Sequence, residues 1–237
     1  MNLHHQEILS LLLDSSGRYS DSKKALFVEN YCGTPRKLLD IKTADRRKLV
    51  KSWCKNHADI FNKQFLDLLD SLYNGELYDE RILTADLLSF FSDYRKALKL
   101  ELLGKWISRL EGWAEIDSTC QSSFSASEVL ERWDEWQPFL SKLSESNSIS
   151  QRRASLVLLV KPTRESDDIR LKKQAFITIE KLIHEKDILI TKAISWLLRQ
   201  LITNHKEEVS AFLDLHSEEI PKIAIRETRR KLETGKK

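Results

Sequence analysis

RASLV at residues 153–157 and KAISW at residues 192–196 share one pattern, in which a small Ala lies inside an apolar helical run, and their Ala residues are 39 positions apart. TADLL at residues 84–88 has the same character, and its Ala lies 69 positions before that of RASLV. Two-helix solenoid repeats have a period of about 40–47 residues. A small side chain where helices cross also lets the next helix approach closely. The pattern therefore favours a solenoid of stacked helix pairs over an irregular helical bundle.

Helical periodicity extends over nearly the whole chain. Apolar residues recur three and four positions apart, and no segment shows the alternation of a strand. We expect helices to break at Asn74-Gly75 and at Lys161-Pro162, and we expect Thr43 and Asp168 to cap the helices that follow them. The sequence predicts an all-α fold.

The composition excludes several classes of protein. The 237 residues carry 39 Lys and Arg against 36 Asp and Glu, a net charge of +3. No apolar run approaches the roughly 20 residues of a membrane-spanning helix, and the N-terminus does not read as a secretory signal. The three cysteines, Cys32, Cys54 and Cys120, suggest neither a disulfide framework nor a zinc site. We expect a cytoplasmic protein that does not associate with membranes.

The common motifs for cofactors and catalysis are missing from the sequence. The glycines form no GxGxxG or Walker-type phosphate loop, the histidines form no HExxH, and no serine lies in GxSxG. His4 and His5 make a poor pair of metal ligands because they lie at the N-terminus, where we expect the chain to fray. We therefore expect no metal, no nucleotide and no other cofactor.

Positive charge is concentrated in a few places. The last thirteen residues, 225–237, hold six basic and two acidic side chains, and the basic ones include Arg226, Arg229 and Arg230. Further basic side chains near predicted helix starts or beside Trp196 are Arg46, Arg47, Arg152, Lys192 and Arg199. Corresponding faces of successive repeats line one groove of a solenoid, so these side chains can form a basic track for a phosphate backbone. Nucleic acid becomes the leading partner; the alternative is a set of solvated helix faces with acidic neighbours.

WAEID at residues 113–117 is the most informative short stretch. Trp113 and Asp117 are four positions apart, so an indole and a carboxylate share one helix face and can meet one ligand together. The structural alternative places Trp113 in the core and Asp117 in a surface pair or cap. Trp196 has the same two interpretations.

Four segments together resemble the AlkD family of alkylpurine DNA glycosylases, which are HEAT-like DNA alkylation repair proteins. They are LDIKTADRRKL at residues 39–49, WAEID at 113–117, QRRA at 151–154 and KAISWLLR at 192–199. The tail IPKIAIRE at 220–227 is of the same type. The resemblance implies a right-handed superhelical solenoid of HEAT-like repeats with a concave basic groove. Residues 1–237 would form one domain, with atypical N-terminal helices over 1–40 and a basic end over 225–237.

The resemblance also implies roles for single residues. Asp117 would be the catalytic carboxylate, Trp113 and Trp196 would flank the deoxyribose of the lesion, and Arg153 would hold the neighbouring DNA backbone. Arg152 is adjacent and could exchange roles with Arg153. The family's N-terminal aromatic residue could correspond to Phe27, to Tyr31 or to neither.

The implied activity is that of a monofunctional DNA glycosylase, a monomer that excises N3- and N7-alkylated purines from duplex DNA by hydrolysing the N-glycosidic bond in base excision repair. One rival is a non-catalytic DNA-binding relative that recognises branched or damaged DNA. The other is a protein-interaction solenoid, whose groove would be apolar instead of basic.

Overall fold

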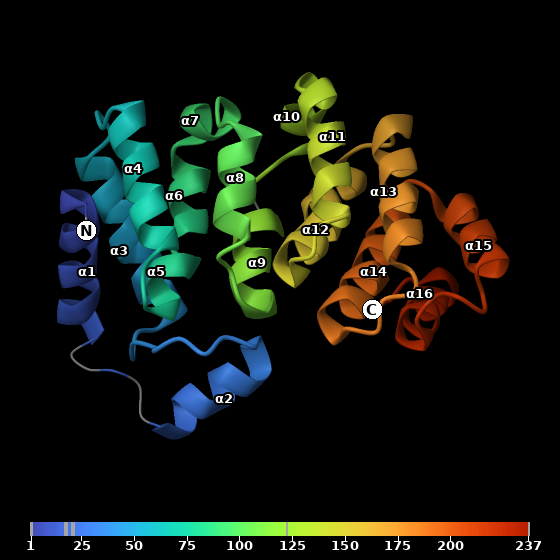
Figure 1. Ribbon diagram of the computed structural model, residues 1–237, viewed down its shortest axis with the longest axis horizontal. Coiled ribbons are helices and arrows are strands. Elements are labelled where there is room, and N and C mark those ends of the chain that lie inside the picture. The colour runs from blue at the N-terminus through green and yellow to red at the C-terminus, as the bar shows by residue number, and fades with distance from the viewer. Residues whose placement is uncertain (1, 17–18, 20–21, 122, 237) are drawn as a thin grey trace. The chain divides into compact units, whose positions relative to one another are not determined.

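The computed structural model describes residues 2–16, 19, 22–121 and 123–236, and in these residues the regular structure is helical (Figure 1). The described part of the chain forms no strand, only the isolated bridges Tyr19–Leu39 and Lys37–Leu77. The prediction of an all-α fold is confirmed. The chain divides into two compact units, Met1–Thr119 and Cys120–Lys237.

The first unit contains nine of the helices that the structure describes. Their bounds are α1 Leu3–Ser16, α2 Ser22–Cys32, α3 Thr43–Asn56, α4 Asn62–Tyr73, α5 Tyr78–Ile82, α6 Thr84–Phe90, α7 Ser92–Lys96, α8 Leu100–Ile107 and α9 Gly112–Gln121, the last two residues of α9 lying past the unit boundary. Helix α1 packs against α3 and α4, and α6 packs against α3, α4, α5 and α7. The buried side of α4 carries Phe65, Leu68, Leu69 and Leu72, none of which is exposed. This spacing is the apolar stripe of an amphipathic helix, which is why the segment folds as one.

The second unit is built of stacked helix pairs. Its helices are α10 Ala126–Glu131, α11 Trp133–Ser144, α12 Ile149–Glu165, α13 Ile169–Leu182, α14 Ile188–Leu201, α15 Lys206–Leu215 and α16 Lys222–Thr234. Helices α12, α14 and α16 pack in one row, and each also packs against the helix before it in the chain (Figure 1). Helix α11 packs against α13 in the other row. Two-layer stacking is the arrangement that the repeated Ala pattern predicted.

Two of the three alanines in the repeated pattern lie in this stack; the third, Ala85 on α6 of the first unit, is only partly buried. Ala154 of α12 and Ala193 of α14 are fully buried, and so is Ala224 of α16. A side chain of one carbon leaves room for the neighbouring helix to pack closely against the backbone. The spacing of Ala154 and Ala193 in the sequence therefore reflects the close packing of the row formed by α12, α14 and α16.

The predicted helix boundaries are only partly right. Asp168 caps α13, since its carboxylate accepts a hydrogen bond from the Arg170 amide at 2.8 Å, and α4 ends before Asn74-Gly75 as expected. The cap at Thr43 is wrong, because the helix already includes Thr43 and Lys42 takes the cap position. The break at Lys161-Pro162 is also wrong: α12 continues to Glu165. A proline this close to a helix end removes one backbone hydrogen bond, and the buried run before it holds the helix together.

Among the described helices, none combines the length and the apolar character that crossing a membrane requires. The assignment of residues 1–237 to a single domain stays a prediction. Lys237, part of the predicted basic end, lies outside the described residues.

Candidate functional site

A close contact between two loops fixes the start of α9. Gly112, its first residue, has φ +69°, and Gly33, just after α2, has φ +72°. A β-carbon at position 112 would lie 2.0 Å from the carbonyl oxygen of Cys32. Only glycine fits this approach, because it tolerates positive φ and has no side chain to displace the neighbouring backbone. The end of α2 is therefore seated directly on the residue before Trp113.

Trp113 is half-buried and contacts α2. Its indole nitrogen donates a hydrogen bond to the carbonyl oxygen of Tyr31 at 2.5 Å, and the two rings meet edge to face with centroids 5.3 Å apart. The Phe27 ring in turn stacks on the Tyr31 ring, with the two centroids 5.7 Å apart. Phe27 and Tyr31 are 64% and 61% exposed. Of the alternatives that the sequence left open, the structure places Tyr31 against Trp113 and Phe27 one ring further away.

Asp117 follows Trp113 one turn later on α9 and is 8% exposed. Glu115, the other carboxylate of this helix, is fully buried. It accepts hydrogen bonds from Thr34 Oγ1 at 2.5 Å, from Arg36 Nε at 3.1 Å and from the Glu111 amide at 3.0 Å. Glu115 thus ties the loop after α2 to α9. Sequence reasoning missed this role, because its partners are up to 81 residues away.

In the second unit, the two candidate arginines of α12 have different partners. Arg153 is 4% exposed and donates a hydrogen bond to the carbonyl oxygen of Leu189 in the first turn of α14. Arg152 forms an ion pair with Glu185 at 2.6 Å. Trp196, on α14, is half-buried. Trp113 and Asp117 belong to the first unit and the α12 and α14 residues to the second, so each half of the predicted site is described within its own unit.

Two of the predicted DNA contacts are structural ion pairs. Arg46 is 6% exposed and its guanidinium donates to Asp79 at 3.0 Å. Arg199 is 8% exposed and pairs with Glu227 at 2.7 Å, which links α14 to α16. A guanidinium that is buried and bonded to a carboxylate presents little surface to a phosphate, so we leave both arginines out of the proposed DNA contacts.

Apart from Arg152, which is paired with Glu185, the other predicted basic contacts lie at the surface. The Arg47 side chain is 68% exposed, with its nitrogen 3.8 Å from Asp86. In the second unit, the exposed basic side chains of the prediction are Lys192 on α14 and Arg226, Arg229 and Arg230 on α16. Glu227, between them in sequence, faces α14 through its bonds to Arg199 and to Ser195 Oγ at 2.5 Å. Helix α16 therefore turns Glu227 toward α14 and its arginines toward solvent, while Glu233 in its last turn is exposed.

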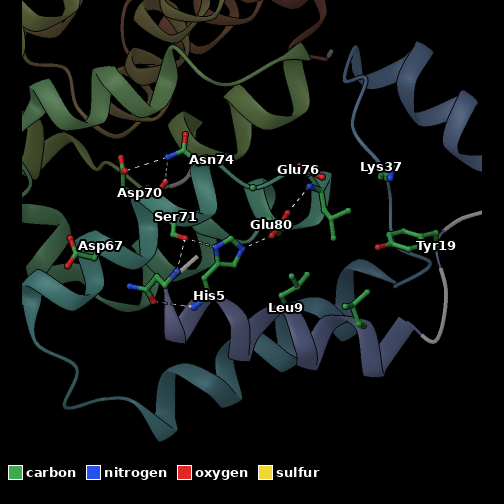
Figure 2. A pocket seen from close by; sticks show the side chains of 14 residues that line it. His5, Leu9, Tyr19, Lys37, Asp67, Asp70, Ser71, Asn74, Glu76 and Glu80 are labelled. Atoms are coloured by element: carbon green, nitrogen blue, oxygen red, sulfur yellow. Dashed lines mark hydrogen bonds and ion pairs between the residues drawn. The ribbon is translucent and has the colours of Figure 1, made fainter.

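A pocket in the first unit lies elsewhere, between α1, α4 and α5 (Figure 2). His5 bridges its wall: Nδ1 is 2.7 Å from Ser71 Oγ and Nε2 is 2.5 Å from Glu80 Oε1. His5 and Glu80 are both 2% exposed. These two contacts of His5 hold α1 against α4 and α5. None of the residues predicted to act on DNA lines this pocket.

Comparison with known proteins decides the family. The sequence profile described as DNA alkylation repair enzyme matches residues 17–232, nearly the whole chain. The chain belongs to the DNA alkylation repair enzyme family. The resemblance seen in the four sequence segments is therefore confirmed at the level of the family. No curated protein matches the chain.

A solved structure has the same fold as this member of the DNA alkylation repair enzyme family. It is described as a predicted DNA alkylation repair enzyme from Enterococcus faecalis, and it matches with a TM-score of 0.74 at 16% identity, over 91% of this chain and 97% of that one. At this identity the likeness concerns the fold alone. Family membership indicates an enzyme with a role in repairing alkylation damage and with DNA as its substrate.

Proposed function

We propose that this DNA alkylation repair enzyme is a monofunctional glycosylase that hydrolyses the N-glycosidic bond of N3- and N7-alkylated purines in duplex DNA. The observation that carries the proposal is that Trp113 and Asp117 lie one turn apart on α9. Trp113 is held by a hydrogen bond to Tyr31 and is extended at the surface by the Tyr31 and Phe27 rings. A carboxylate beside an aromatic surface suits a cationic substrate.

The chemistry of the lesion sets what the site must supply. Alkylation at N3 or N7 gives the purine a positive charge, so the base leaves with the bonding electron pair as a neutral molecule. Water adds to C1′ of the deoxyribose, one proton passes to solvent, and an abasic site remains. Because the leaving group is already cationic, acid catalysis has little to add. The enzyme gains most by stabilising the positive charge that develops on the sugar.

Asp117 is the residue of α9 suited to this role. An ionised carboxylate stabilises an oxocarbenium-like sugar electrostatically and can position the attacking water. Glu115 is fully buried and its oxygens accept bonds from Thr34 and Arg36, so we give Glu115 a structural part instead. The faces of aromatic rings attract cations by about 0.5–2 kcal/mol each, so Trp113, and Trp196 by resemblance to the family, would favour the charged lesion.

In this proposal the exposed basic side chains bind the DNA. On α16 and α14 these are Arg226, Arg229, Arg230 and Lys192, and in the first unit Arg47. Exposed arginines and lysines bind phosphates and release counterions, which gives affinity without sequence preference. The family resemblance assigns the backbone next to the lesion to Arg153, or to Arg152 beside it. Arg153 is only 4% exposed and Arg152 is paired with Glu185, so the proposed DNA affinity rests on the exposed side chains and not on these two.

The test is an excision assay on duplex DNA methylated with a simple alkylating agent, run in the presence of a chelator. Released 7-methylguanine and 3-methyladenine are measured together with the abasic sites formed. We expect Asp117→Asn to lose most single-turnover excision while it keeps its DNA affinity. Glu111→Gln is the matched control, because the Glu111 side chain is half exposed and lies just before α9.

Two outcomes would contradict the proposal. If Asp117→Asn excises as fast as the unaltered protein, the carboxylate has no catalytic part. If the unaltered protein binds damaged duplex but releases no base, it is the non-catalytic DNA-binding relative. Weak binding without any dependence on salt would instead favour the protein-interaction solenoid.

A further inference from the structure

Two histidines and a glutamate meet in the first unit, away from the residues of α9. His4 and Glu7 lie one turn apart on α1, and His57 follows the last residue of α3. His57 Nε2 is 3.2 Å from Glu7 Oε2, and His4 Nδ1 is 3.8 Å from the same oxygen. One ligand atom from each of the three residues lies within 4.8 Å of the others.

His57 is held in an orientation that leaves one nitrogen available. Its Nδ1 is 2.9 Å from the carbonyl oxygen of Trp53, so this nitrogen carries a proton and donates it. The ring also stacks on Trp53 with centroids 4.1 Å apart and planes 15° apart. A histidine that donates from one nitrogen to a backbone carbonyl presents the other as a lone pair, the usual arrangement of a metal ligand.

Glu7 is oriented by the same tryptophan. The Trp53 indole nitrogen donates to Glu7 Oε2 at 2.9 Å, so the carboxylate is fixed opposite His57. A lone pair on His57 Nε2 and a carboxylate oxygen repel one another at 3.2 Å unless a cation lies between them. That cation is either a proton on His57 or a metal ion that His4 joins as a third ligand.

The separations and the exposure fit a metal ion. Ligands about 2.0–2.2 Å from a tetrahedral ion lie roughly 3.3–3.6 Å from one another, close to the two distances to Glu7. The side chains of His4, His57 and Glu7 are 26%, 23% and 45% exposed, so an ion and its remaining water ligands can reach them. Two imidazoles and one carboxylate suit Zn²⁺ and its neighbours in the first transition row, whereas Mg²⁺ and Ca²⁺ prefer oxygen ligands alone.

We propose that His4, Glu7 and His57 form a binding site for a divalent transition-metal ion, with Zn²⁺ as its natural occupant, that fastens α1 to the end of α3. The site is separate from the proposed excision chemistry, which uses none of these residues. Its effect would be on the stability of the first unit.

The experiment uses full-length protein without an affinity tag, freed of metal by a chelator, and titrated with Zn²⁺ alone in a calorimeter. We expect one high-affinity equivalent and a rise in the thermal midpoint. Co²⁺ should give visible absorption bands typical of nitrogen and oxygen ligands. His4→Gln and His57→Gln should each weaken Zn²⁺ binding at least about tenfold and remove the midpoint rise, since each loses one of three ligands.

The control is His184→Gln, an exposed histidine of the second unit, which should bind Zn²⁺ like the unaltered protein. His4→Gln keeps the Trp53–His57 stack, so it remains informative even if His57→Gln folds poorly. Absence of Zn²⁺ heat and of Co²⁺ bands in the unaltered protein would overturn the proposal in favour of a protonated His57 paired with Glu7. Equal binding by His4→Gln and the unaltered protein would overturn it too. Neither result depends on excision activity.

Discussion

The indole nitrogen of Trp113 and the carbonyl oxygen of Tyr31 are joined by a hydrogen bond of 2.5 Å across 82 positions of the chain. Trp113 belongs to the helix that carries Asp117, and Tyr31 to α2, one of the helices that the sequence marked as atypical. The position of the tryptophan therefore depends on how α2 is seated. Substitutions at the contact between α2 and α9 should therefore affect the helix that carries the proposed catalytic residue.

Gly112→Ala should destabilise the first unit strongly. The new β-carbon would meet the Cys32 carbonyl oxygen at 2.0 Å, and the residue would keep φ +69°. Strain and overpacking together should cost about 3 kcal/mol of unfolding free energy. Gly235→Ala is the matched control: it has the same φ but no atom within 4 Å of the added carbon, and should cost about 1 kcal/mol or less. Urea denaturation of both variants checks this; equal losses would show that the close approach does not exist.

Glu115→Gln should cost far more than Glu111→Gln. Glu115 is fully buried against Arg36, and removing one charge of a buried pair typically costs about 3–5 kcal/mol. Glu111 pairs with the same arginine but has a side chain 50% exposed, so its loss should cost under about 1 kcal/mol. The measurement is the unfolding free energy of each variant in urea. Similar values for the two would contradict the buried network.

Asp70 should make stability depend on pH in the acid range. Burial alone would raise its pKa, but hydrogen bonds from the Trp106 indole and from Arg109 outweigh it and hold the pKa below 3.8. A carboxyl whose pKa is lower in the folded state stabilises the protein above its unfolded pKa and loses this contribution as pH falls through the folded pKa. Asp70→Asn should therefore be less stable than the unaltered protein at pH 7, and the difference should shrink below about pH 3.8. Denaturation curves between pH 2.5 and 7 test this; a constant difference would contradict it.

Arg226→Gln should weaken duplex DNA binding and lower its salt dependence. Arg226 is exposed on α16, and removal of one bound phosphate from the interface should reduce the slope of log affinity against log salt by about 0.9. Arg170→Gln is the control, since Arg170 lies on α13, in the other helix row, and is paired with Asp168 at 2.8 Å. Binding is measured by fluorescence anisotropy at several salt concentrations. If the control lowers the slope as much, α16 is not the binding face.

The cysteines should resist alkylation in the native protein. Cys32, Cys54 and Cys120 are all buried, and burial raises the pKa of Cys54 to about 12. The thiolate is the reactive form, and a raised pKa leaves almost none of it near pH 8. Iodoacetamide should label three cysteines in denaturant and none within minutes in the folded state. Rapid labelling of Cys54 would contradict its place in the core.

The sequence by itself determined the helices, their pairing as repeats and the family. Each of these depends on local information: apolar spacing, a cap such as Asp168, or a short motif such as WAEID. The physical reason is that helix formation and the choice of the buried face are governed by residues within a few turns of one another. The misplaced boundary at Pro162 shows the limit of this, since tertiary burial carried α12 past a local stop signal.

The tertiary structure alone decided what the charged and aromatic side chains do. Arg46 and Arg226 look alike in the sequence, yet the first is bonded to Asp79, 33 positions away, and the second is exposed. His57 meets His4 only because α3 packs against α1. A side chain's charge gives no sign of a distant partner, and pairing across the chain sets whether that charge is buried or offered to a ligand. Such contacts exist only once the helices are stacked.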